Sequence, residues 1–205
     1  VNMTLDENRE DEYWDTTRVL GSAFYQWDVY KYVASIAIKD NTVVDIGCGA
    51  GYKLYNIVGK IANNIIGIDQ DNPIKYCKET YDKGAWLVEN FEKPKINIER
   101  KIDIIINSDV IEHLIEPDSV LEYIKKLATE STIIVFSTPD RDRMRGCSCM
   151  ESKKPEHIRE WNFNEFKAYV NNSGFEIIEH FHQYPLKCTF NNLRTYIQIW
   201  KNKTF

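Results

Sequence analysis

The sequence predicts a doubly wound α/β fold whose sheet is mostly parallel and has an antiparallel C-terminal strand. Three observations support this prediction. Short apolar runs alternate with helical patterns, as is typical of chains that build parallel sheets. A glycine-rich turn, GCGAG at residues 47–51, directly follows the first of these runs. After Gly174 two strand-like runs follow one another without a helix between them, which predicts an antiparallel end to the sheet.

Five apolar runs are the expected parallel strands. Each is nearly continuous, as is typical of strands that are buried on both faces. The runs cover residues 42–46, 64–69, 85–89, 103–108 and 132–138. The expected closing pair is FEIIEHFHQYP at residues 175–185 and LRTYIQIWKN at residues 193–202. Five β/α alternations followed by such a pair indicate a Rossmann-like open sheet.

Two helices are marked clearly by their ends. Residues 116–128 place Pro117 in the first turn and carry an apolar stripe. Residues 163–172 follow Asn162, which is a good N-cap residue, and Glu165 stands three places later. The first 41 residues are acidic and aromatic, and they predict one or two helices that pack on the core or cover its active edge.

Length and composition favour one domain. The 205 residues suit one sizeable core, so we expect a single domain over residues 1–205, with a helical segment at 1–41 and an α/β core at 42–205. The net charge of −5 offers no basic footprint for nucleic acid, and no apolar stretch approaches the roughly 18 residues of a membrane span. Five cysteines without paired spacing favour a cytoplasmic protein. The oligomeric state stays open, a homodimer included.

The glycine turn predicts where a ligand binds, because open α/β sheets bind ligands beyond the carboxyl ends of their strands. Gly47, Gly49 and Gly51 have the spacing GxGxG, whereas dinucleotide-binding folds have GxGxxG. Asp45 precedes the turn by two residues, where a carboxylate suits an ammonium group better than a pyrophosphate. Asp69 ends the second strand, at the spacing of an acid that accepts hydrogen bonds from a ribose.

An amine, a carboxylate and a ribose occur together in S-adenosylmethionine (SAM). The stretches VVDIGCGAG (43–51), IIGIDQD (65–71) and INSDVIEHL (106–114) together resemble motifs of the class I SAM-dependent methyltransferases. This resemblance covers residues 40–182, and it implies SAM as the methyl donor and S-adenosylhomocysteine (SAH) as the product. The SAM contacts that it implies are Asp45, Gly47, Cys48, Gly49 and Gly51 for the methionine part, Asp69 for the ribose, Gln70, Asn90 and Phe91 for the adenine, and Ser108, Asp109 and Val110 after the fourth strand.

Methyl transfer to a hydroxyl group is helped by a base near the incoming oxygen, and histidine is the usual candidate. His113 and His157 follow the fourth and fifth strands, at the edge where the chemistry is expected. The stretch PEHIREW at residues 155–161 resembles an active-site stretch of methyltransferases found in glycan biosynthesis. We therefore expect His157 to be the base, supported by Arg159 and Glu160, with His113 as the alternative.

The segment from Pro139 to Trp161 is predicted to bind the methyl acceptor. It has little regular pattern, and loops of such length usually serve a function. Its arginines suit a phosphate or a sugar acid, while a merely solvated loop is the alternative reading. The expected acceptor contacts are Arg141, Arg143, Arg145, Arg159 and Glu160 in this segment, and Tyr13 and Trp14 in the aromatic N-terminal segment.

Together these features predict O-methylation of a sugar hydroxyl on a nucleotide-, phosphate- or glycan-linked acceptor. Small aromatic, quinone-like or lipid acceptors are the alternative within the enzymes. A cofactor-binding protein without turnover is the alternative outside them.

A resemblance to the ubiquinone-pathway O-methyltransferases raises the question of a metal. Those enzymes carry an E-x-x-E-H stretch after the fourth strand that can hold a divalent cation, and here it reads DVIEH at residues 109–113. The aspartate shortens the first ligand, so we expect Glu112 and His113 to buttress the turn and no metal to be used. If a cation is bound, the resemblance implies Asp109, Glu112 and His113 as its ligands.

Overall fold

The computed structural model describes residue 21 and residues 25–152, 154–183 and 195–202, the last range by its backbone. Its strands lie close to the predicted runs. Two of the parallel strands coincide with the prediction, and the other three differ by one residue at one or both ends. The strands are β1 (Thr42–Ile46), β2 (Asn64–Asp69), β3 (Ala85–Val88), β4 (Ile104–Ser108), β5 (Ile133–Pro139), β6 (Phe175–Gln183) and β7 (Thr195–Asn202).

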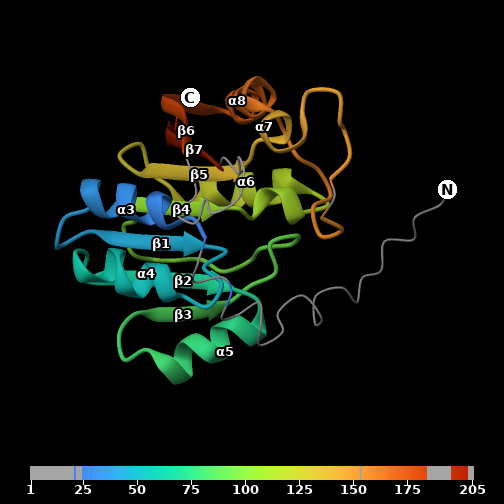
Figure 1. Ribbon diagram of the computed structural model, residues 1–205. Helices are drawn as coiled ribbons and strands as arrows, with labels where there is room; N and C mark the ends of the chain where they lie inside the picture. The colour runs from blue at the N-terminus through green and yellow to red at the C-terminus, as the bar shows by residue number, and fades with distance from the viewer. Residues whose placement is uncertain (1–20, 22–24, 153, 184–194, 203–205) are drawn as a thin grey trace.

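These strands form one sheet in the order β3-β2-β1-β4-β5-β7-β6 (Figure 1). The first five strands in this order pair in parallel, and β7 is antiparallel to both β5 and β6. The chain runs outward from β1 to β3 and then returns to β4, so strand order reverses between β1 and β4. The predicted doubly wound sheet with an antiparallel C-terminal strand is confirmed, and its switch point places a ligand site beyond the ends of β1 and β4.

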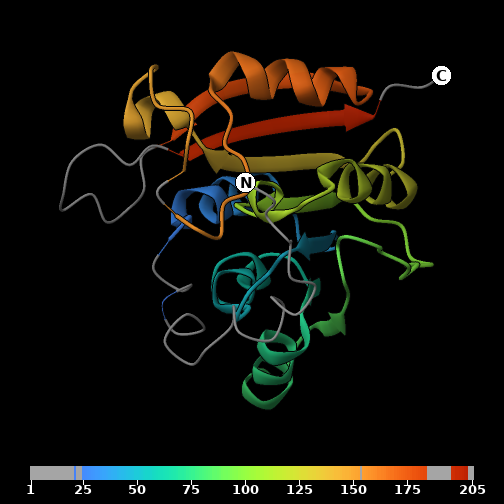
Figure 2. The same ribbon diagram turned by 90° about the vertical axis from the view of Figure 1, so that its right-hand side faces the viewer.

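Helices cover both faces of the sheet (Figures 1 and 2). Neighbouring residues of a strand face opposite sides, and in β4 Ile104 and Ile106 belong to one buried cluster while Ile105 belongs to the other. The first cluster also contains residues of α3 (Trp27–Ile36), α4 (Tyr52–Asn56) and α5 (Asp71–Thr80). The second contains residues of α6 (Pro117–Leu127) and α8 (Phe163–Asn172).

The predicted helix ends are present. Pro117 lies at the first position of α6, and α8 covers the predicted residues. The side chain of Asn162 accepts a hydrogen bond from the Glu165 amide at 2.9 Å, and the Glu165 carboxylate accepts one from the Asn162 amide at 3.0 Å. This reciprocal capping box satisfies two amides at the start of α8 and fixes where the helix begins.

The segment from Pro139 to Trp161 is more regular than predicted, because it contains the short helix α7 (Arg141–Arg145). Asp140 caps this helix by accepting a hydrogen bond from the Asp142 amide at 3.0 Å. Gly146 follows it at a φ of 83°. A five-residue helix made of charged residues and one methionine has no apolar periodicity, so the sequence pattern did not reveal it.

In the N-terminal segment the structure describes Gly21 and all residues from Tyr25 onward, and α3 begins at Trp27. Val29, Tyr30 and Val33 are buried against the sheet, as expected for a helix packed on the core. Tyr13 and Trp14 lie outside the described residues. Within the described ranges, no helix has both the length and the apolar character needed to cross a membrane.

Strand β6 forms one end of the described sheet, and β7 connects it to β5. The register of this pair shifts between Ile177 and Glu179, which marks a β-bulge, and Ile178 is exposed there. Figure 2 shows α8 lying along this end of the sheet.

Candidate functional site

The turn after β1 has backbone positions that only glycine fits. Gly47 and Gly51 adopt φ angles of 89° and 68°, which side chains rarely tolerate. A Cβ atom on Gly47 would collide with Val110, and one on Gly51 would lie 2.7 Å from Trp86. The turn is therefore packed closely against Val110, the residue predicted to line the site two places after β4.

Asp45 is fully buried in β1 directly before this turn. The Tyr30 hydroxyl donates a hydrogen bond to its Oδ2 atom at 2.9 Å, whereas Oδ1 has no partner among the described residues. Burial raises the pKa of Asp45 to about 7. A buried carboxylate with one unpartnered oxygen is suited to receive an ammonium group.

Lys53 is a candidate site residue that the sequence did not reveal. It lies in α4, is buried, and places its Nζ atom 5.2 Å from the centre of the Tyr30 ring. Burial lowers the pKa of Lys53 to about 8, although the Asp45 charge acts in the opposite direction. Asp45 and Lys53 thus place a buried acid and a buried base around one tyrosine, which suits a ligand that carries both an ammonium group and a carboxylate.

Asp69 joins the end of β2 to the glycine turn. Its Oδ2 atom accepts a hydrogen bond from the Gly49 amide at 2.6 Å, and Oδ1 accepts one from the Gln70 amide at 2.8 Å. The side-chain oxygen of Gln70 is buried and has no partner among the described residues. The predicted ribose and adenine positions therefore lie next to the turn, and one of them offers a spare acceptor.

Three further predicted SAM contacts occupy different surroundings. Cys48 is buried in the turn, and its thiol donates to the Gly49 carbonyl oxygen at 3.5 Å. Phe91 packs in a core cluster, while Asn90 is exposed and accepts a hydrogen bond from the Glu92 amide at 2.8 Å. Their contacts with SAM remain predictions.

Asp109, directly after β4, adopts a φ of 53° that is uncommon for a residue with a side chain. The Ser137 hydroxyl donates to its Oδ1 atom and the Gln26 amide group donates to its Oδ2 atom, each at 2.8 Å. Ser108 lies within 2.7 Å of Ser137, oxygen to oxygen. Both carboxylate oxygens of Asp109 are thus occupied by groups from β5 and from the segment before α3.

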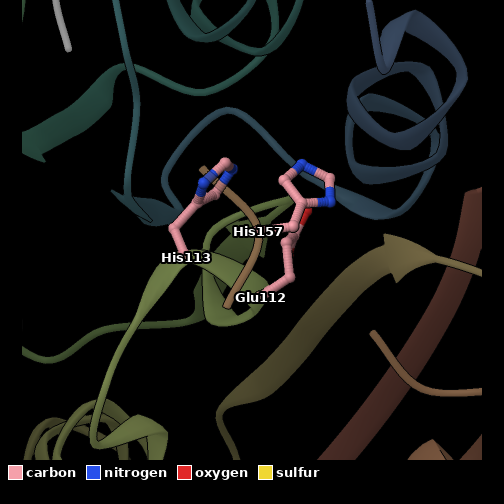
Figure 3. A group of neighbouring side chains, drawn as sticks. All are labelled: Glu112, His113 and His157. Atoms are coloured by element: carbon pink, nitrogen blue, oxygen red, sulfur yellow. The ribbon is translucent and has the colours of Figure 1, made fainter. Parts of the chain in front are cut away.

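Glu112, His113 and His157 form a cluster after β4, in which Glu112 and His157 are buried and His113 is half-buried (Figure 3). The 3₁₀ helix η4 (Ile111–His113) follows Val110 and supplies the first two side chains, and the loop before α8 supplies His157. The imidazole rings of His113 and His157 meet edge to face with their centres 4.6 Å apart. The two histidines that were predicted as alternative bases therefore lie in contact with each other.

The surroundings of Glu112 and His113 disfavour charge. Burial, with the Asp109 charge added, raises the pKa of Glu112 well above its usual range. The Thr138 hydroxyl donates to its Oε2 atom at 3.1 Å, whereas Oε1 has no partner among the described residues. Burial, with His157 added, lowers the pKa of His113 to about 4, so this ring is neutral near pH 7.

His157 is oriented by Glu160, whose Oε1 atom lies 2.5 Å from Nδ1 of the ring. Glu160 also pairs with Arg145 and accepts a hydrogen bond from Ser152 at 2.9 Å. Burial acts to raise the pKa of Glu160, but the hydrogen bonds from His157, Arg145 and Ser152 lower it to about 2. An ionised Glu160 accepts the Nδ1 proton of His157, so Nε2 of the neutral ring carries the lone pair.

The four predicted arginines divide into two pairs. Arg141 and Arg145 are buried and bind acidic side chains of the loop and of α8. The Arg143 side chain is half exposed beside Asp140, and Arg159 is exposed and donates to the carbonyl oxygen of Ile115 at 2.7 Å. The first pair builds the loop, and the second pair reaches the surface.

The sheet order, the crowded GxGxG turn and the acids at the carboxyl ends of β1 and β2 define a class I SAM-dependent methyltransferase fold. Residues 22–180 match a family model described as a methyltransferase domain. The chain therefore belongs to this methyltransferase family, whose cofactor is SAM.

Individual relatives are distant. The chain is 24% identical over 134 residues to the Mycobacterium tuberculosis protein designated probable S-adenosylmethionine-dependent methyltransferase MT3114. The aligned residues cover 65% of this chain and 48% of that protein. The chain thus spans about half the length of this relative. It is 37% identical over 54 residues to a tRNA U34 carboxymethyltransferase of Shewanella frigidimarina, covering 26% of the chain and 16% of that enzyme.

A solved structure extends the likeness in fold. A chain in the complex between the Haloferax volcanii Trm112 methyltransferase activator and a methyltransferase superposes with a TM-score of 0.75 at 14% identity. The match covers 92% of this chain and 94% of that one.

Proposed function

We propose that the protein transfers the methyl group of SAM to a hydroxyl group of a sugar that is linked to a nucleotide, a phosphate or a glycan. When bound, SAM supplies a methyl group on a positively charged sulfur, which a hydroxyl oxygen attacks in line. The observation that carries the proposal is the His157–Glu160 pair, an imidazole fixed by a buried carboxylate.

A chain of contacting residues connects the glycine turn with the His157–Glu160 pair. Val110 packs against Gly47, His113 belongs to the η4 turn that follows, and the ring of His157 meets the ring of His113. The Glu112 carbonyl oxygen also accepts a hydrogen bond from the Ile158 amide at 2.9 Å, which holds the His157 loop in place. An acceptor hydroxyl at this edge would meet Nε2 of His157, which can accept its proton.

The cofactor side has groups that match SAM. Asp45 suits the ammonium group, Lys53 the carboxylate and Asp69 the ribose hydroxyls. The spare oxygen of Gln70 suits the adenine amino group. Because positioning contributes much of the rate of an in-line displacement, these fixed contacts support catalysis as well as affinity.

The sugar acceptor rests on the loop around His157. Arg143 and Arg159 are the exposed arginines there, and guanidinium groups bind phosphates and carboxylates well. The similarity of PEHIREW to glycan-biosynthesis methyltransferases points the same way. The net charge of −5 disfavours a large nucleic acid, and the tRNA-modifying relative matches over only 54 residues.

A methyl-transfer screen with detection by mass tests the acceptor class. The protein and SAM would be incubated with nucleotide-sugars, phosphorylated sugars, phenolic acceptors and tRNA. We expect one added methyl group on a sugar substrate. Methylation of only phenols or only tRNA would show that the acceptor belongs to that class and would overturn the proposed sugar acceptor.

Substitutions test the residue roles. We expect His157→Ala to lower turnover by roughly 10²- to 10⁴-fold, the usual contribution of a general base, while SAH binding is kept. Asp69→Ala should weaken SAH binding in calorimetric titration, and the wild-type protein should show no comparable binding of NAD. Normal turnover of His157→Ala together with a loss in His113→Ala would assign the base to His113.

A further inference from the structure

We propose that Glu112, His113 and His157 form a binding site for one divalent d-block metal ion such as Zn²⁺, Mn²⁺ or Co²⁺. This ligand set differs from the Asp109, Glu112 and His113 set that the sequence implied. His157 takes the place of Asp109, because both oxygens of Asp109 already accept hydrogen bonds from Ser137 and Gln26.

The geometry brings one ligand atom of each side chain close together. These three atoms lie within 4.8 Å of one another, and Figure 3 shows the three side chains side by side. Ligand bonds of about 2.0–2.2 Å place neighbouring ligands of a tetrahedral ion about 3.4 Å apart, so the side chains need to rotate inward to complete the site. Two ligands come from one turn, and the third comes from a loop that is bonded to that turn through Ile158 and Glu112.

Both histidines are held in the tautomer that a metal needs. The Nδ1 atom of His113 lies 3.0 Å from the Glu156 carbonyl oxygen, which can only accept, so this nitrogen carries the proton. In His157 the Nδ1 atom faces the Glu160 carboxylate at 2.5 Å, which imposes the same tautomer. In the tautomer that these contacts favour, Nε2 of each ring carries the lone pair. An imidazole anchored through its second nitrogen by a carbonyl or carboxylate is the usual arrangement around bound metals.

Glu112 supplies the reason for a cation. Its side chain is fully buried, and its Oε1 atom has no hydrogen-bond partner among the described residues. A buried carboxylate oxygen without a partner is costly unless a cation or a donor reaches it. A cation between Glu112 and the two imidazole rings would satisfy this oxygen.

The donor atoms also select the kind of metal. Two imidazoles and one carboxylate suit d-block divalent ions, while Mg²⁺ and Ca²⁺ prefer oxygen ligands. Three protein ligands leave at least one coordination position open, as in catalytic metal sites. Cation binding here does not depend on the proposed function, but its use in catalysis rests on it.

In that use, the acceptor hydroxyl occupies the open position. The cation makes the hydroxyl more acidic, its proton passes to solvent water, and the oxygen forms the new bond to carbon as the sulfur–carbon bond breaks. Sulfur keeps the electron pair of the broken bond, and SAH leaves as a neutral thioether. His157 is then a ligand, and the cation takes over the activation that the imidazole alone would provide.

Cobalt titration of the chelator-treated full chain tests the site without any acceptor. We expect visible absorption bands that saturate at one Co²⁺ per chain and that Zn²⁺ displaces. Glu112→Gln and His157→Gln should each weaken Co²⁺ binding by at least about tenfold, because each removes one of three ligands. Glu160→Gln should weaken it by about 10- to 100-fold, the usual effect of losing the partner of a metal-bound histidine.

His182→Gln is the matched control, because His182 lies on β6 and is not part of the cluster. It should bind Co²⁺ as the wild type does. SAH affinity, measured on every variant, reports that the fold is intact. Absence of saturable Co²⁺ and Zn²⁺ binding, or binding that Glu112→Gln leaves unchanged, would overturn the proposal.

Activity separates this inference from the proposed function. We expect a chelator to lower methyl transfer at least about tenfold without changing SAH affinity, and Zn²⁺, Mn²⁺ or Co²⁺ to restore it. Cation binding without methylation of any sugar would support the site and remove the proposed acceptor. Full methylation of a sugar by protein that binds no cation would support the proposed function and overturn the cation site.

Discussion

Among single residues, Asp45 is expected to make the proposed binding of SAM and SAH depend on pH. Burial raises the pKa of its carboxyl group to about 7, so the neutral form dominates below that pH and the charged form above it. Only the charged form attracts an ammonium group. SAH affinity is therefore expected to fall as the pH drops from about 8 to about 6, in calorimetric titrations. Asp45→Asn should bind SAH weakly with little pH dependence. If the SAH affinity of the wild type is equally independent of pH, Asp45 does not bind the ammonium group.

Lys53 can be tested with a pair of ligands. SAH carries an amino-acid carboxylate, whereas 5′-methylthioadenosine lacks the amino-acid part. Lys53→Met is expected to weaken SAH binding by about 10- to 100-fold, the equivalent of losing one hydrogen bond to a charged group at about 1.5–3 kcal/mol. Binding of 5′-methylthioadenosine should stay the same. Equal losses for both ligands would mean that Lys53 acts on the turn as a whole.

The contrast between Asp45 and Lys53 shows what a sequence reveals about single residues. Asp45 was predicted because it precedes a glycine turn at a fixed spacing. Lys53 was not, because a lysine in a short helix usually lies at the surface, whereas here Lys53 is buried near Tyr30 of α3. The contact between His113 and His157 joins positions far apart in the chain, so no local spacing could show it.

Among the elements, α8 offers a test of local stability. Asn162→Ala removes the side-chain acceptor of the capping box, and we expect a loss of about 1 kcal/mol in the free energy of unfolding. Urea denaturation followed by circular dichroism measures this loss. Asn172→Ala, at the exposed last turn of the same helix, is the control and should change stability little. Similar losses in both variants would show that the cap contributes nothing specific.

Elements with strong local signals were predictable, and those without were not. The β1 and β2 boundaries matched because continuous apolar runs are interrupted by a glycine turn and by a polar residue. The α8 start matched because Asn162 and Glu165 satisfy each other. In contrast, α7 depends on one aspartate cap and on ion pairs made by Arg141 and Arg145 with residues further along the chain, which a local pattern does not contain.

At the scale of the whole molecule, the sheet order explains why the site residues meet. Parallel strands end at one edge, so the acids at the carboxyl ends of β1, β2 and β4 come together although they are separated along the chain. The alternation of strands and helices was enough to predict this gathering. It could not predict the acceptor, since that depends on side chains of a loop whose shape is set by tertiary contacts.

The bulged strand β6 bears on how the protein behaves at high concentration. A sheet edge with unpaired amides is a template for another strand, and proteins blunt such edges with charges and irregular register. In β6 the shift between Ile177 and Glu179 breaks the regular ladder, and Glu176 and Glu179 add negative charge beside the exposed Ile178. This combination disfavours the pairing of β6 with strands of other molecules, which would lead to aggregation.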